Sequence, residues 1–151
     1  MKRISAFLKK FFLIDDTPHK IAAGAALGIF LGIIPGEGVL ATLVLASLFH
    51  FNRLSATAGV LAFNMWATVV ILPISAGVGA FIFQTNPQEL IANFNSTYKL
   101  GLKFFLSKII FFELVLPLIV GFLITAGIIA LVFYFLIYFL LKYKNKNTSS
   151  L

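Results

Sequence analysis

The stretch GAALGIFLGIIPGEGVLATLVL, residues 24–45, decides the fold, because Pro-Gly-Glu-Gly divides its apolar run into two halves. Pro35 removes a backbone N–H and prevents a continuous α-helix, while Gly36 and Gly38 allow a turn with positive φ. Lipid cannot satisfy the backbone groups that such a break frees, so in a membrane the break must be buried in protein or line a wet cavity. The stretch therefore predicts a helical hairpin whose tip is the Pro-Gly-Glu-Gly turn.

The composition places the chain in a bilayer. Of 151 residues, 60% are hydrophobic and only 11% are charged, with a mean hydropathy of +1.02, whereas soluble domains carry roughly 25% charged residues. The net charge of +7 does not indicate nucleic-acid binding, because the basic residues flank the apolar runs. They are Lys2, Arg3, Lys9, Lys10 and Lys20 before the first run, and Lys142, Lys144 and Lys146 after the last. This pattern is typical of anchoring to anionic lipids at the cytoplasmic face.

The fold class predicted is an all-α membrane protein with a single membrane domain over residues 1–151. The expected segments are an interfacial amphipathic helix (1–16), a glycine-rich re-entrant hairpin (17–52), a transmembrane helix (55–83) interrupted by Asn64 and Pro73, an amphipathic surface segment (84–108), a second transmembrane helix (109–141), and a disordered cytoplasmic tail (142–151). The apolar halves 21–34 and 39–51 are each shorter than the roughly 20 residues that a span needs. A re-entrant hairpin is therefore preferred to two spans, and a single kinked span is the alternative.

Three glycines at four-residue spacing, Gly24, Gly28 and Gly32, precede the break. Two consecutive GxxxG units leave a groove without side chains, along which another helix can approach closely. We expect the two arms of the hairpin to pack tightly and to seal its tip.

The candidates for a substrate or ion site are Glu37, Asn64, Thr68 and Arg53. Glu37 would be a proton or cation site or a gate, or else only a cap of the helix that starts at Val39. Asn64, with Thr68 nearby, would contact substrate or form a hydrogen bond between helices. Arg53 is expected at the foot of the hairpin, in the interface. We expect no metal site.

The stretch 24–38 resembles the signature of a bacterial membrane family, domain of unknown function 2062. The matching residues are Gly24, Ala26, Gly28, Phe30, Gly32, Pro35 and Gly38. FNRLSATAGVLAFN, residues 51–64, is similar to the family's next block, although the family usually has Asn-Pro where Asn64 is followed by Met65. The resemblance covers residues 17–141 and implies a multi-pass protein of the bacterial inner membrane, without an established activity.

Enzymatic activity and cofactors are not expected. The chain has no cysteine, no HExxH motif around His19 or His50, and no phosphate-binding GxxxxGK[ST] loop. The preferred function is a small carrier or flippase-like transporter of an anionic or lipid-linked substrate at a broken-helix site. The alternative is a structural or accessory protein that packs against a partner complex. Because so small a chain can hardly enclose a path, we expect a homo-oligomer or a partner membrane protein.

Both termini are predicted to face the cytoplasm, because both carry dense lysine and arginine. Lys99, Lys103 and Lys108 would then lie at the outer interface. Since the native chain has no cysteine, a single cysteine introduced at each end can be labelled with a membrane-impermeant maleimide. Both should react only from the cytoplasmic side. A C-terminus labelled from outside would instead indicate the single kinked span.

Overall fold

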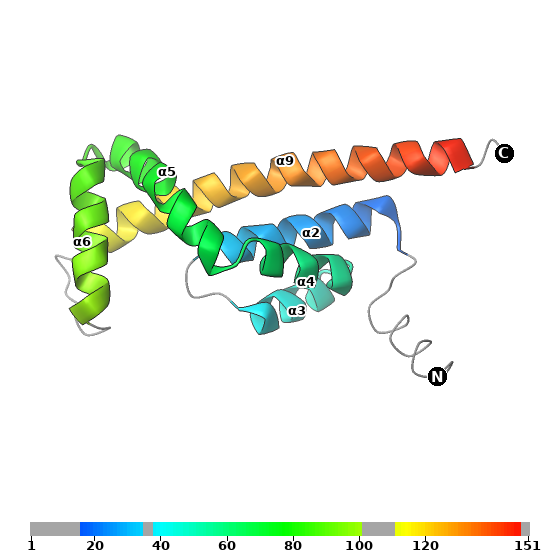
Figure 1. The fold of residues 1–151 in the computed structure, drawn as a ribbon, viewed down its shortest axis with the longest axis horizontal. Helices are drawn as coiled ribbons and strands as arrows, with labels where there is room; N and C mark the ends of the chain where they lie inside the picture. Colours follow the sequence, from blue (N-terminus) through cyan, green and yellow to red (C-terminus); the bar gives the residue numbers. More distant parts are fainter. Residues whose placement is uncertain (1–15, 35–37, 101–110, 149–151) are drawn as a thin grey trace.

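The computed structural model describes residues 16–34, 38–100 and 111–148, and every regular element within these ranges is helical (Figure 1). The elements are α2 (Pro18–Ile33), α3 (Val39–Leu48), α4 (Arg53–Ala62), α5 (Met65–Phe83), α6 (Pro87–Leu100), a π-helical turn (Phe111–Val115) and α9 (Leu116–Thr148).

The long helix α9 sets the long axis of the molecule (Figure 1). Helix α2 packs against both α4 and α9, α5 packs against α9, and α3 packs chiefly against α4. The start of α2 and the end of α9 lie at one end of the molecule, here called the foot end. Helix α6 lies across the opposite end, steeply inclined to α9, and that end is called the α6 end.

The chain runs out from the foot end along α2 and returns along α3. Thr17 caps α2 by accepting a hydrogen bond from the backbone N–H of Lys20 at 3.4 Å, and Pro18 occupies the first turn. At the end of the return, the backbone N–H of Asn52 donates to the carbonyl of Lys20 at 3.1 Å. The α-helix is interrupted between Ile33 and Val39, where the sequence predicts a break, while Pro35, Gly36 and Glu37 lie outside the described residues.

Backbone contact joins α2 to α4. A Cβ atom added to Gly28 would lie 2.8 Å from the backbone nitrogen of Val60 and closer still to the carbonyl oxygen of Ala56. From the other side, a Cβ on Gly59 would lie 2.5 Å from the carbonyl oxygen of Ala25. The two helices therefore touch at a distance that leaves no room for a side chain at either glycine.

The helix that lies against the glycine groove differs from the one expected. Gly24 faces the backbone of Asn52, and Gly32 faces the carbonyl of Phe63, so the whole groove lies along α4. The expectation that the two hairpin arms pack tightly against each other is wrong, because α3 packs mainly on α4. Helix α4 can come this close because it presents Ala56 and Gly59 to the groove, whereas α3 has no glycine.

A second backbone contact joins α5 to α9. A Cβ on Gly79 would lie 2.8 Å from the carbonyl carbon of Pro117, and one on Gly121 would lie 2.9 Å from that of Ser75. Buried alanines and Phe122 surround this contact and form part of the core. Helix α9 thus holds α2 on one part of its length and α5 on another.

Two expected boundaries change. The segment 55–83 is divided, because α4 ends at Ala62 and α5 begins at Met65, whereas Pro73 is accommodated inside α5. Helix α9 continues to Thr148, so residues 142–148 are helical and not disordered. Extending an existing helix adds a hydrogen bond per residue, and lysines near its C-terminus interact favourably with the helix dipole. The expected interfacial helix over 1–16 lies almost wholly outside the described residues.

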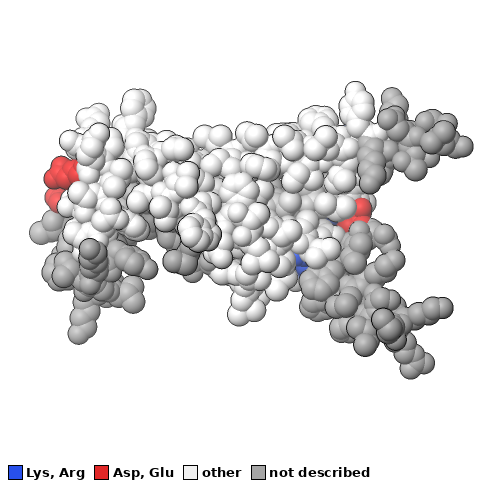
Figure 2. Space-filling model, in the orientation of Figure 1, with Lys and Arg blue, Asp and Glu red and all other residues white. Residues whose placement is uncertain are grey.

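The surface between the two ends is apolar. Figure 2 shows a wide uncharged zone between the acidic side chains at the α6 end and the charged side chains near the foot end. Large apolar side chains are exposed there, including Trp66 and Phe81, each 86% exposed. Within the described residues, one helical segment, Phe112–Tyr143 with 32 residues, is long and apolar enough to cross a membrane.

The α2–α4 contact predicts that replacement by alanine destabilises the protein at Gly28 but not at Gly77. Gly28→Ala should lower the unfolding temperature in detergent, because overpacking typically costs about 1–3 kcal/mol. Gly77→Ala is the matched control, since a Cβ at Gly77 would meet nothing within 4 Å and alanine favours the helix by up to about 1 kcal/mol. Equal unfolding temperatures for the two variants would show that the groove is not closely packed.

Candidate functional site

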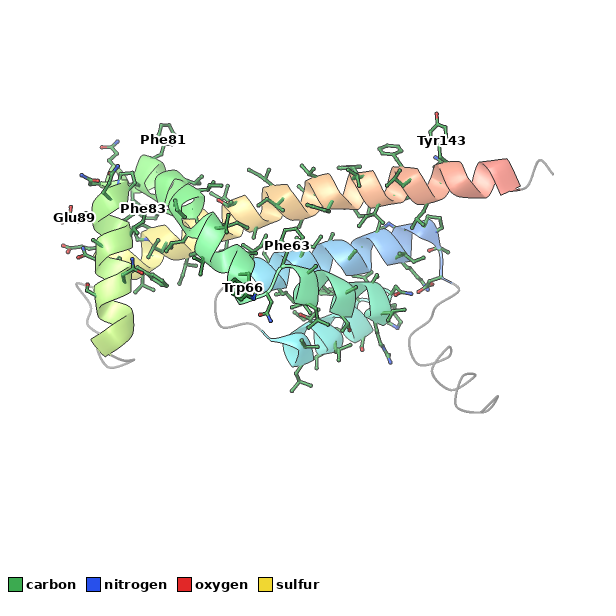
Figure 3. The ribbon with its side chains drawn as sticks, in the orientation of Figure 1. Phe63, Trp66, Phe81, Phe83, Glu89 and Tyr143 are labelled. Carbon is green, nitrogen blue, oxygen red and sulfur yellow. The ribbon has the colours of Figure 1, made fainter. Side chains whose placement is uncertain are left out.

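The end of α2 and the α4–α5 junction meet beside α9. The last turn of α2 lies against the α4–α5 junction, since a Cβ on Gly32 would be 2.7 Å from the carbonyl oxygen of Phe63. The Phe63 ring packs edge-on against Phe133 of α9, with ring centroids 5.2 Å apart. The end of α2 and the α4–α5 junction therefore lie well inside the length of α9 and away from its ends (Figures 1 and 3).

Local hydrogen bonds end one helix and start the next at the α4–α5 junction. The backbone N–H of Phe63 donates to the carbonyl of Gly59 at 3.1 Å, and that of Ala67 donates to the carbonyl of Asn64 at 2.7 Å. Asn64 occupies the junction itself and is exposed. Trp66, labelled with Phe63 in Figure 3, follows on the first turn of α5.

The structure places Asn64 and Thr68 on or just after the α4–α5 junction and Arg53 at the other end of α4. Asn64 lies at the junction, and Thr68 follows one turn later on α5, with its side chain outside the described part of the chain. Glu37 belongs to the interruption between α2 and α3 and is also outside that part. Arg53 begins α4 at the foot end, about 14 Å along the helix at 1.5 Å per residue from Ala62, where α4 ends before Asn64. Arg53 therefore belongs to a different place.

The start of α3 faces the same interruption. Gly38 is its N-cap, and no described side chain caps the helix there. Thr42, fully buried, donates its hydroxyl to the carbonyl of Gly38 at 3.2 Å. The first N–H groups of α3 thus carry the partial positive charge of a helix N-terminus.

The foot end holds a polar cluster that joins the starts of α2 and α4. The side-chain oxygen of Asn52, only 3% exposed, accepts a hydrogen bond from the backbone N–H of Ser55 at 2.8 Å. Its amide nitrogen donates to Asp16 at 3.5 Å, and Asp16 also pairs with Lys20 at 3.5 Å. Arg53 was predicted here from the sequence, but Asn52, which is central to the cluster, was not. An asparagine directly before a helix is typical of an N-cap, and this position could have identified Asn52.

A polar hollow of about 300 Å³ lies at the α6 end. Its lining residues are Thr85, Asn86, Glu89, Leu90, Asn93 and Glu113. Among the described residues, no three histidine or acidic side chains gather closely enough to hold a metal ion. The hollow therefore brings two carboxylates from distant segments to one end of the molecule.

Two buried hydroxyls were also missed. Ser75 on α5 is fully buried and Thr125 on α9 is 6% exposed, and neither hydroxyl has a hydrogen-bond partner. Each lies four residues from a close-packed glycine, Gly79 and Gly121 respectively, so small-residue spacing is the signal that could have found them. They place two buried hydroxyls on the two helices of the α5–α9 contact.

The cap at Asn52 predicts a stability difference. Asn52→Ala should destabilise the protein by about 0.5–2 kcal/mol, because the N–H of Ser55 loses its partner. Asn52→Ser retains an acceptor oxygen and should lose less. Thermal unfolding in detergent measures both, and an alanine variant as stable as the serine variant would contradict a capping role.

The comparisons with known proteins agree with this helical, largely apolar chain. The model of the family described as "Uncharacterized protein conserved in bacteria (DUF2062)" matches residues 1–149, which confirms the resemblance seen in the glycine-proline stretch. No curated protein and no solved structure matches the chain. Since the match covers almost its whole length, the chain belongs to this bacterial family.

Proposed function

We propose that this protein is embedded in the bacterial inner membrane and carries an anionic or lipid-linked substrate past its two helix interruptions. The single observation that supports transport is that the end of α2, directly before its interruption, lies against the α4–α5 junction, where a Cβ on Gly32 would be 2.7 Å from the carbonyl oxygen of Phe63. Discontinuous helices near the bilayer midplane are the usual construction of substrate sites in secondary transporters.

The dimensions support an orientation with α9 along the membrane normal. Helix α9 has 33 residues, about 50 Å at 1.5 Å per residue, and the hydrocarbon core is about 30 Å thick. No charged residue lies between Glu113 and Lys142. Helix α6 would then lie near the outer interface, and the start of α2 and the end of α9 would share the cytoplasmic side (Figure 1).

The start of α3 supports an anionic substrate. Its N-terminus, which no described side chain caps, follows the interruption, and helix N-termini in broken helices hold anionic groups through free N–H groups. In this proposal Glu37 controls access or carries a proton, and Asn64 supplies a hydrogen-bonding group. Arg53, at the foot end, contributes to the interface with anionic lipids.

The apolar surface supports assembly. Helix α3 exposes Leu40 by 77% and Leu48 by 66%, and α5 exposes Val69 and Val70 by 72% each. In this proposal a second copy or a partner membrane protein covers part of this surface and completes the path that one short chain cannot enclose.

A second candidate is an accessory protein without transport. One observation favours it: α2 and α4 touch backbone to backbone at Gly28, so no substrate fits between them. In this case the glycines serve only packing, and Glu37 is only a cap of α3.

Transport can be tested in vesicles that contain fluorescent phosphatidylglycerol, with dithionite to report its movement between leaflets. Wild-type protein should accelerate this movement over protein-free vesicles. Glu37→Gln should insert equally well and lose most of the acceleration, because a glutamine carries neither charge nor proton.

Glu113→Gln is the matched control, since it removes a carboxylate at the α6 end, distant from the interruptions. It should leave the rate unchanged. If the folded wild-type protein moves the lipid no faster than empty vesicles do, flippase-like transport of anionic lipid is wrong and the accessory role is favoured.

A further inference from the structure

An apolar groove of about 410 Å³ lies between α2 and α9, on the part of the molecule nearer the foot end. Its lining residues are Ala23, Ala26, Leu27, Phe30, Phe51, Gly127, Ala130, Leu131 and Tyr134. The groove exists because small side chains from both helices face it. A Cβ at Gly127 would meet nothing within 4 Å, so this glycine does not serve close packing as Gly28 does.

Polarity increases along α9 from the groove toward the foot end. Tyr134, at the edge of the groove, shares a hydrogen bond with His19 of α2, with 2.8 Å between the hydroxyl oxygen and Nδ1. Tyr138 stacks on Tyr134 with ring planes 9° apart. The ammonium of Lys142 lies 5.7 Å from the centre of the Tyr138 ring. Ala130 and these three α9 residues follow one another at four-residue spacing, and therefore lie along one helix face.

We propose that this groove binds one acyl chain of an anionic phospholipid of the surrounding bilayer, with its phosphate toward Lys142. The apolar groove matches the chain, the hydroxyl and imidazole groups of Tyr134 and His19 match the ester region, and the lysine matches the phosphate. Lys142 lies about 12 Å beyond Tyr134 along the helix. At membrane interfaces, aromatic residues likewise lie at the level of the headgroups, and basic residues lie beyond them near the anionic surface.

The charge distribution favours an anionic lipid in this orientation. Lys20 also lies at the foot end, next to His19, although Asp16 pairs with it at 3.5 Å. The opposite end carries Glu89 and Glu113, which would repel a phosphate placed there. The binding of a resident lipid does not require transport, so it stands or falls separately from the carrier function.

Tryptophan fluorescence tests the site in the full-length protein. The chain has one tryptophan, Trp66, which is exposed on α5 and does not line the groove. The variant Trp66→Phe/Leu131→Trp moves the reporter to the groove. It is reconstituted in two sets of phosphatidylcholine vesicles. One set contains brominated phosphatidylglycerol and the other contains the same amount of brominated phosphatidylcholine, and the brominated acyl chains quench tryptophan on contact.

Brominated phosphatidylglycerol should occupy the groove in preference to brominated phosphatidylcholine by about fivefold, which corresponds to about 1 kcal/mol for one basic residue. Trp66 in the wild-type protein should be quenched equally by both lipids. Lys142→Gln, added to the reporter variant, should reduce the preference while quenching by both lipids persists.

Gly127→Leu should fill the groove and abolish the preference, and Gly77→Leu, at an open glycine outside the groove, should leave it unchanged. Equal quenching by the two lipids at position 131 would overturn the proposal. So would a preference that survives Gly127→Leu. Weak quenching by both lipids, with strong quenching at Trp66, would overturn it in favour of a protein partner in the groove.

Discussion

The structure depends on backbone contact between α2 and α4 at Gly28. Helix α2 has only 16 residues, and it provides the surface on which both α4 and α9 rest. In a lipid environment the hydrophobic effect gives little drive for helix association, so close van der Waals packing of small residues must supply it. A side chain at Gly28 would move α4 outward and, with it, the α4–α5 junction that lies against the end of α2. The contact between the end of α2 and the α4–α5 junction therefore follows from the four-residue spacing of Gly28 and Gly32.

The buried polar side chains among the described residues lie at a few positions. At the foot end, Asn52 satisfies the start of α4 and reaches Asp16. At the interruption, Thr42 bonds to the carbonyl of Gly38 within its own helix. Ser75 and Thr125 differ, because their hydroxyls are buried without a hydrogen-bond partner on the two helices of the α5–α9 contact. A buried hydroxyl without a partner costs free energy in an apolar interior. The α5–α9 contact carries this cost at both hydroxyls.

The sequence predicts local features of the backbone well, but it does not predict which helices pack against each other. Pro35 with two glycines is sufficient to predict the helix break, because backbone chemistry alone forbids a regular helix there. The glycine spacing likewise predicts a close helix contact, but it contains no information about which helix makes it, and α4 takes the place expected for α3. The hollow that Glu89 shares with Glu113 was not predicted, since only the fold brings the two segments together. The lysine-rich end of α9 was expected to be disordered from its composition, yet the long helix before it extends through these residues.

The packing of α2 against α9 joins two segments that lie far apart in the sequence. During synthesis α2 is made before α4, and α4 before α9, and α2 is shorter than the roughly 20 apolar residues that a span needs. The glycine face of α2 is covered once α4 has been made, but its other face has no packing partner until α9 is made. A nascent chain that stops before Leu116 therefore lacks the α2–α9 and α5–α9 contacts, and its core is complete only after α9 has been made.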